Sequence, residues 1–323
     1  MSPAPPFRLL FVVGPTACGK TELAVQAVES ARGRRPLPLL NCDSVQVFAS
    51  IDVGAAKPSA AQLARAPHRL LSFVPEGHGY TAGDYRKDAT AEIDRLREAG
   101  VHGALVVGGS GFYARALEVG MPEAPPSDPL VKAGIEARAA DEGLLALHRE
   151  LARKDPERAA RVAPADHYRI VRALEIMALQ PRTLTELERA FAESRGQPTF
   201  AVRKIGLMRS RESMRRAVEV RVAGMLADDG LLVETESFRR RGLGEWAPLR
   251  SVGYKEAQAV LDGKLSGGSL HDAVVTSTMQ LAKRQMTWFR RDPDVDWHDV
   301  DSLDGRRRAL DAIRDWTDGP CEV

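Results

Sequence analysis

The sequence has few cysteines, and their spacing forms no known pattern. Cys18, Cys42 and Cys321 are the three cysteines among 323 residues. They fit neither a disulfide framework nor the paired spacing of a zinc site. This scarcity excludes a small disulfide-stapled fold and suits a reducing compartment.

Long apolar runs and a secretion signal are also missing. No stretch of about 18 apolar residues could span a bilayer. The N-terminal MSPAPPF places no basic segment before the apolar run that follows. We therefore predict a soluble, cytoplasmic protein with no membrane partner, and a monomer is the default expectation.

The net charge is small, so it says little about partners. It is +2 at pH 7, but the charges are unevenly distributed along the chain. Residues 203–221 hold seven basic side chains against only Glu212 and Glu219. A local basic segment of this kind is typical of a surface that meets phosphates.

The strongest local pattern is GPTACGKT, which fits the phosphate-binding spacing G-x-x-x-x-G-K-[ST]. It lies between an apolar run, 7–13, and a segment with helical spacing that starts at Thr21. In such a loop, backbone N–H groups and a helix N-terminus hold the phosphates, the lysine adds a positive charge and the hydroxyl suits Mg²⁺. We expect a phosphorylated ligand here, although most chains with this loop bind ATP or GTP. The predicted loop residues are Gly14, Pro15, Thr16, Ala17, Cys18, Gly19, Lys20 and Thr21.

Short apolar runs alternate with helical segments, which predicts an α/β fold with a parallel sheet. We expect strands at 7–13, 37–40, 104–107 and 201–208, and a helix over 84–99. After residue 121 a proline-rich stretch leads into helical periodicity with almost no strand pattern. The predicted domains are a first part of the core (1–122), a helical insertion (123–200), a second part of the core with basic helices (201–300) and a peripheral tail (301–323).

Two polar segments follow predicted strands and should meet the loop, because ligands bind beyond the carboxyl ends of parallel strands. LPLL runs into Asp43, and ALVV runs into Gly108-Gly109-Ser110. Asp43 could be a metal ligand or a base, or it could simply cap a turn. An NTP hydrolase would normally end an apolar strand in an aspartate, and ALVV does not.

Two basic segments favour nucleic acid. Residues 271–291 place Lys283, Arg284, Arg290 and Arg291 around Trp288 and Phe289, a mixture suited to stacking on bases and binding phosphates. Residues 166–176 place Arg169 and Arg172 on one helical face, where they could hold phosphates or pair with acids such as Glu175.

Taken in order, these segments resemble the tRNA dimethylallyltransferase (isopentenyltransferase) family. The matching stretches are GPTACGKT, DSVQVF with GAAKP, GGSGFY, DHYRIVRALEI, LRSVGYKEA and AKRQMTWFR. The resemblance spans about residues 8–298. It implies a P-loop kinase-like fold with a helical insertion that grips the anticodon stem. It also implies transfer of a dimethylallyl group from dimethylallyl diphosphate to N6 of the adenosine at tRNA position 37.

The resemblance assigns roles to individual residues. The P-loop would hold the diphosphate, with Thr21 toward Mg²⁺ and Lys20 and Arg221 neutralising the leaving group, so no ATP is consumed. Asp43 would accept the N6 proton, and Ser110, where the family usually has Thr, would place the amine. The implied contacts to the tRNA anticodon stem-loop are Asp43, Ser44, Val45, Gln46, Ser110, Tyr168, Arg169, Arg172, Arg250, Lys283, Arg284, Gln285, Trp288 and Arg290.

Several positions depart from the usual family pattern. Ala217 stands where the first arginine of a paired-arginine helix is common, which leaves Arg221 with Lys20 as the expected diphosphate cations. Tyr168 replaces a frequent Gln, so its contact could be stacking. Cys18, Phe48 and Arg69 are further departures. The zinc finger of eukaryotic relatives is absent, which implies a bacterial-type enzyme.

Two other functions stay open at this point. An ATP-dependent nucleotide or small-molecule kinase explains the loop, Asp43 and the sheet, but not the basic and aromatic segments. A nucleic-acid-binding protein with a degenerate loop explains the basic segments, but gives no reason for Lys20, Thr21 and Asp43 to occur together.

Overall fold

A computed structural model describes residues 6–30, 37–194 and 199–318 of the chain. The chain divides into two compact units, which are described separately below. The sheet unit comprises 1–119 and 198–323, and the helical unit comprises 120–197. Residues 1–5, on which the prediction of no secretion signal partly rests, lie outside the described residues. Cys321 also lies outside them. Within the described residues, no helix is long and apolar enough to cross a membrane.

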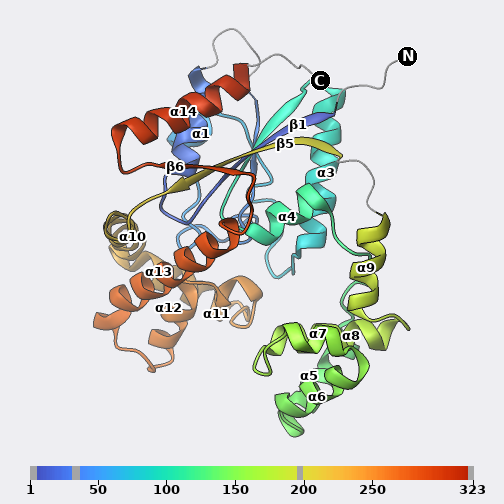
Figure 1. Cartoon of the computed structure of the whole chain (residues 1–323). Helices are drawn as coiled ribbons and strands as arrows, with labels where there is room; N and C mark the ends of the chain where they lie inside the picture. The colour runs from blue at the N-terminus through green and yellow to red at the C-terminus, as the bar shows by residue number, and fades with distance from the viewer. Residues whose placement is uncertain (1–5, 31–36, 195–198, 319–323) are drawn as a thin grey trace. The chain divides into compact units, whose positions relative to one another are not determined.

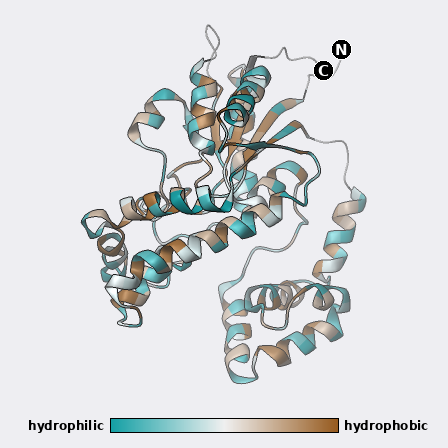
Figure 2. Cartoon of the chain, turned by 60° about the vertical axis from the view of Figure 1, so that its left-hand side comes forward, coloured by the Kyte–Doolittle hydropathy of each residue, from teal (hydrophilic) through white to brown (hydrophobic). Residues whose placement is uncertain are grey.

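The sheet unit is built on an all-parallel sheet, as the alternating pattern predicted. Its strand order is β3-β2-β4-β1-β5-β6, and every pairing is parallel. The strands are β1 (Phe7–Val13), β2 (Leu39–Asn41), β3 (His68–Arg69), β4 (Gly103–Val107), β5 (Phe200–Met208) and β6 (Val295–Asp299). β1 and β4 are almost wholly buried, as expected for central strands covered by helices on both faces. The strands are largely coloured hydrophobic in Figure 2.

Helices cover the sheet on both sides (Figure 1). α1 packs against α14, and α3 packs against α4. A capping box between Thr81 and Asp84 fixes the start of α3. The bounds are α1 (Lys20–Ser30), α2 (Ala60–Arg65), α3 (Ala82–Glu98), α4 (Gly111–Val119) and α14 (Leu303–Asp318).

A second group of helices follows β5. Residues 211–240 form two helices and not one, because Asp228 and Asp229 both adopt φ of 53°. α10 packs against α13, and α11 packs against α12. The elements are α10 (Arg211–Leu226), η1 (Ala227–Asp229), α11 (Gly230–Arg240), η2 (Ala247–Arg250), α12 (Tyr254–Leu261), η3 (Gly267–Ser269) and α13 (Leu270–Phe289).

The prediction of a peripheral tail at 301–323 is wrong for the residues described. α14 buries Ala309, Ile313 and Trp316 against the rest of the sheet unit. The Arg8 guanidinium donates to the Trp316 carbonyl at 2.8 Å and lies 4.7 Å from its ring. The many charges of this segment hid three apolar positions with helical spacing, which form the buried stripe of an amphipathic helix.

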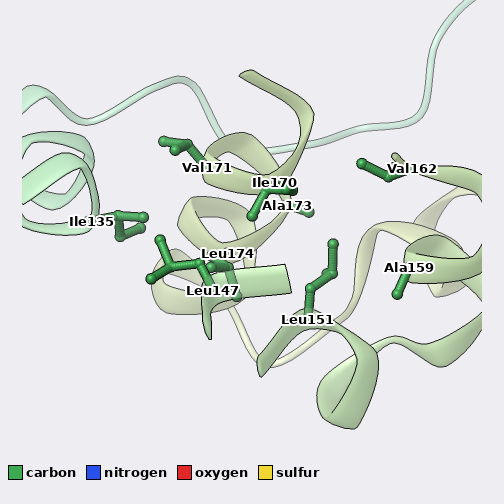
Figure 3. Packing of buried hydrophobic residues seen from close by; sticks show 9 residues of the cluster. All are labelled: Ile135, Leu147, Leu151, Ala159, Val162, Ile170, Val171, Ala173 and Leu174. Atoms are coloured by element: carbon green, nitrogen blue, oxygen red, sulfur yellow. The ribbon is translucent and has the colours of Figure 1, made fainter. Parts of the chain in front are cut away.

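The helical unit has its own small core. It contains α5 (Pro129–Asp141), α6 (Leu144–Lys154), α7 (Pro156–Arg161), α8 (His167–Leu179) and α9 (Leu184–Ser194). Nine buried side chains pack together in it (Figure 3), namely Ile135, Leu147, Leu151, Ala159, Val162, Ile170, Val171, Ala173 and Leu174. The absence of strands among its described residues fits the predicted all-helical segment.

Candidate active site

The loop GPTACGKT connects β1 to α1, the context that its sequence predicted. Gly14 and Gly19 adopt φ of 137° and 79°, which favour glycine. A Cβ on Gly14 would lie 2.4 Å from the Leu207 carbonyl oxygen. Glycine is therefore required at 14 both by its conformation and by the close approach of β5.

The Lys20 ammonium lies over the loop that precedes it. It donates to the carbonyl oxygens of Gly14 at 3.0 Å and Pro15 at 2.8 Å. Burial lowers the pKa of Lys20, and the nearby Asp43 acts in the opposite direction. The next residue, Thr21, is only partly buried in the first turn of α1, and its hydroxyl bonds to no other described residue. That hydroxyl is available to a ligand.

Cys18 takes no visible part in this chemistry. Its side chain is buried, and burial raises the pKa of the thiol to about 11. The thiol therefore stays protonated and points into the protein, so the loop acts through its backbone at this position.

Asp43 follows β2 and forms a turn. Its Oδ1 accepts from the N–H groups of Val45 at 2.9 Å and Gln46 at 3.3 Å. This is the turn-capping role that the sequence left open, and it uses one of the two carboxylate oxygens. Among the described residues Oδ2 has no hydrogen-bond donor, so it can still accept a proton.

Ser110 joins the Asp43 turn to the end of β4. The Ser44 N–H donates to Ser110 Oγ at 2.9 Å, and Ser110 Oγ donates to Ser44 Oγ at 3.3 Å. Gly108 allows this approach, since a Cβ there would lie 2.0 Å from the Cys42 carbonyl oxygen. The two predicted polar segments therefore meet, as the edge of a parallel sheet requires.

Arg221 reaches the same edge from α10. Its Nη1 donates to Thr16 Oγ1 at 2.7 Å and its Nη2 to the Ala55 carbonyl at 3.4 Å. Burial lowers the pKa of Arg221, while Asp43 opposes that change. Lys20, Asp43 and Arg221 thus lie within electrostatic reach of one another, and Ala217 contributes no second cation.

The segment 52–57 is held by a clamp that no sequence pattern predicted. The Glu234 carboxylate accepts from the N–H groups of Asp52, Val53 and Gly54 and from the Tyr254 hydroxyl. Burial is the main cause that raises the pKa of Tyr254. Glu234 lies in none of the stretches that carried the family resemblance, so nothing in the sequence singled it out.

The clamped segment supports two predicted site residues. Gln46 Nε2 donates to the carbonyls of Ala55 and Ala56, both at 3.2 Å, and Arg221 shares the Ala55 carbonyl. The predicted tRNA contact Gln46 therefore has its amide fixed by the protein.

α13 presents cations and an aromatic ring to its surface. An open hollow of about 460 Å³ is lined by Gln280, Lys283, Arg284, Thr287, Trp288 and Arg291. Trp288 is 37% exposed and packs edge to face with Phe112 at 6.4 Å. Within the described part of the chain, Lys283, Arg284, Arg290 and Arg291 form no ion pair. Their charge is therefore available to a partner.

Other predicted tRNA contacts are engaged within the protein. Arg250 pairs with Glu245 at 3.0 Å. In the helical unit, Arg169 pairs with Asp166 at 3.4 Å and Arg172 with the buried Glu175 at 2.6 Å, while Tyr168 is 70% exposed. Arg172 also donates to the Pro125 carbonyl, so it fixes the start of this unit.

The residues at the site fit a magnesium ion that arrives with its phosphates. The described residues contain no group of three or more His, Cys, Asp or Glu that could hold a metal. Mg²⁺ commonly keeps several waters and binds through substrate phosphates with one or two protein oxygens. The Thr21 hydroxyl, beside the loop that would hold those phosphates, suits that arrangement.

Comparison with known proteins identifies the family. A model of the family described as IPP transferase matches residues 46–292. The chain belongs to this family. A tRNA dimethylallyltransferase of Bdellovibrio bacteriovorus is 40% identical to this chain over 293 residues, which are 90% of this chain and 93% of the relative.

Solved structures of similar proteins agree with the fold. A tRNA isopentenylpyrophosphate transferase from Bacillus halodurans aligns with a TM-score of 0.68 at 28% identity, covering 97% of this chain and 96% of its own. A eukaryotic dimethylallyltransferase, described as acting on tRNA, aligns with a TM-score of 0.78 at 21% identity, and this likeness supports only the fold of the chain. It covers 96% of this chain and 79% of the eukaryotic one.

Proposed function

We propose that this chain is a tRNA dimethylallyltransferase that modifies N6 of the adenosine adjoining the anticodon. The observation that carries the proposal is the convergence of four groups at one edge of the sheet. The P-loop gives an anion cradle, Lys20 and Arg221 supply positive charge, and Asp43 offers a carboxylate oxygen that accepts from no described residue. A basic and aromatic surface on α13, whose cations form no ion pair with a described residue, lies in the same unit.

The reaction joins N6 to the allylic carbon of dimethylallyl diphosphate. As the N6 lone pair forms the new C–N bond, the bond from that carbon to the diphosphate oxygen breaks, and the diphosphate leaves with the electron pair. N6 then loses a proton to Asp43 Oδ2. Ser110, tied to Ser44, holds the amine in line with the allylic carbon.

The leaving group gains negative charge as it departs, and fixed positive groups stabilise that charge more than they stabilise the bound donor. Lys20 and Arg221 are held for this by the protein itself, through Gly14, Pro15 and Thr16. A magnesium ion held by Thr21 would neutralise further charge on the diphosphate. No ATP is required.

The adenosine must leave its stack before N6 can reach Asp43. Extruding a base costs about a few kcal/mol of lost stacking. The exposed Trp288 and Phe112 pair beside Gly111 offers aromatic surface that offsets this cost, and Lys283, Arg284 and Arg290 hold the phosphates of the same strand. In the helical unit, the exposed Tyr168 and Arg169 are the proposed contacts to the anticodon stem.

A direct assay tests the proposal. Purified protein is incubated with Mg²⁺, dimethylallyl diphosphate and unmodified tRNA that carries adenosine next to the anticodon. Mass analysis of the nucleosides should show the gain of one dimethylallyl group on that adenosine. ATP turnover without this gain would instead support a kinase.

Two variants of Asp43 separate its two roles. Asp43→Asn keeps an oxygen that can accept from Val45 and Gln46 but cannot take the N6 proton, whereas Asp43→Ala loses both functions. We expect each to slow single-turnover transfer by about 10² to 10⁴-fold and to leave the tRNA dissociation constant nearly unchanged. A near-normal rate for Asp43→Asn would remove Asp43 from the base role.

A further inference from the structure

The side-chain amide of Gln285 bridges two loops of the active site. Its Oε1 accepts from the Thr16 N–H at 2.8 Å, and its Nε2 donates to the Gly109 carbonyl at 3.0 Å. Thr16 belongs to the loop after β1, and Gly109 to the loop after β4, the neighbouring strand. One side chain of α13 thus sets the distance between both loops.

The second loop is shaped to receive α13. A Cβ on Gly109 would lie 2.4 Å from Gln285 Nε2, and one on Gly111 would lie 2.1 Å from the Trp288 ring. Gln285 and Trp288 are three residues apart and therefore lie on the same face of the helix. Both glycines leave the space that this face occupies.

The bridge also decides which N–H groups can bind a phosphate. Pro15 has no N–H, and the N–H of Thr16 is engaged by Gln285. The hydroxyl of Thr16 accepts from Arg221 of α10. Thr16 is therefore held from two helices, and the N–H groups left for a diphosphate begin at Ala17.

The neighbours of Gln285 on α13 differ from it. Lys283, Arg284 and Trp288 are exposed, whereas Gln285 is partly buried and both ends of its amide bond to the protein. A side chain used in this way has no polar group directed at a partner.

We propose that Gln285 is a positioning residue for the diphosphate donor and not a contact to tRNA. The inference rests on the proposed function and assigns Gln285 to the donor side of that same site. By fixing Thr16 against Gly109, Gln285 holds the anion cradle at a set distance from Ser110.

Two methionine variants of the same helix test the assignment. Gln285→Met keeps the length of the side chain and loses both hydrogen bonds, while Lys283→Met removes an exposed charge two residues away. The affinity of each variant for inorganic diphosphate with Mg²⁺ is measured by calorimetry, and its affinity for tRNA by filter binding. Circular dichroism and thermal melting check that both are folded.

We expect Gln285→Met to weaken diphosphate binding by about tenfold, the effect of losing one to two net hydrogen bonds. Its tRNA dissociation constant should stay within about twofold of the wild-type value, because the substitution removes no direct contact to tRNA. Lys283→Met should show the reverse pattern. Weaker tRNA binding by Gln285→Met with unchanged diphosphate binding would overturn the inference.

Gln285→Glu gives a second test, in which the side chain keeps its size and shape. Its carboxylate can still accept from Thr16, but it cannot donate to Gly109 and adds a negative charge beside the cradle. The KM for dimethylallyl diphosphate should rise more than in Gln285→Met, with the KM for tRNA little changed. An unchanged donor KM would count against the inference, whereas failure of the wild-type protein to bind diphosphate or transfer the group would refute the proposed function itself.

Discussion

α10 and α13 pack against each other, and α10 and the C-terminal end of α13 both carry basic residues, but these charges are used differently. On α10, Arg215 and Arg216 pair with Glu219 and Glu212 of the same helix, whereas Arg221 turns toward the site. At the end of α13, Lys283 and Arg284, with Arg290 and Arg291 directly after the helix, have no acidic partner among the described residues. The number of basic residues in a segment therefore does not show how many charges are available to a partner, because acidic neighbours in the same helix neutralise some of them.

Among the basic residues of α10 and α13, Arg221 should have the largest effect on activity. Arg221→Gln removes positive charge next to the departing diphosphate, so we expect single-turnover transfer to fall by about 10² to 10³-fold, with tRNA affinity little changed. Arg216→Gln on the same helix is the matched control and should transfer at the wild-type rate. Equal transfer rates for the two variants would contradict the claim that Arg221 acts at the site whereas Arg216 does not.

The unpaired cations of α13 should have the next largest effect. Replacing Lys283 and Arg284 together by Ala should weaken tRNA binding. It should also lower the slope of log K against log salt by about 0.7 to 0.9 for each phosphate that the protein no longer neutralises. Filter binding at several salt concentrations measures this slope. A slope equal to that of the wild type would mean that these cations do not meet phosphates.

The paired cations of α10 should have the smallest effect. Arg215 and Arg216 have side chains that are 60% and 64% exposed, and such pairs contribute about 0 to 1 kcal/mol each. Replacing both by Ala should change the free energy of unfolding by no more than about 2 kcal/mol in total and leave tRNA affinity unchanged. Urea denaturation and filter binding check both values, and a large loss of tRNA affinity would contradict the comparison.

The sheet and the site edge were predictable because they depend on short-range patterns. β1, the P-loop and the start of α1 are set by consecutive residues, and parallel strands bring Asp43 and Ser110 to the same edge. The short strand β3 and the strand β6 were missed, because two residues carry no periodicity and VDWHD is mostly polar.

Long-range interactions of single side chains could not be predicted. Glu234 clamps residues 52–54 from 180 or more positions away, and Gln285 reaches Thr16 across 269 positions. Both interactions depend on how helices pack, and the sequence around each residue contains no pattern that indicates it. For Gln285, the family resemblance implied a contact to tRNA, whereas both ends of its amide bond to the protein.

The position of β1 in the sheet has a consequence for synthesis of the chain. β1 lies between β4 and β5, and the residues of β5 follow the whole helical unit in the sequence. On the ribosome, the edge of β1 that pairs with β5 therefore remains open after β4 has emerged, until the whole helical unit (120–197) has also emerged. The helical unit, whose residues are contiguous, can fold during that interval. The sheet unit is completed last, when α14 brings Trp316 to Arg8 of the first strand.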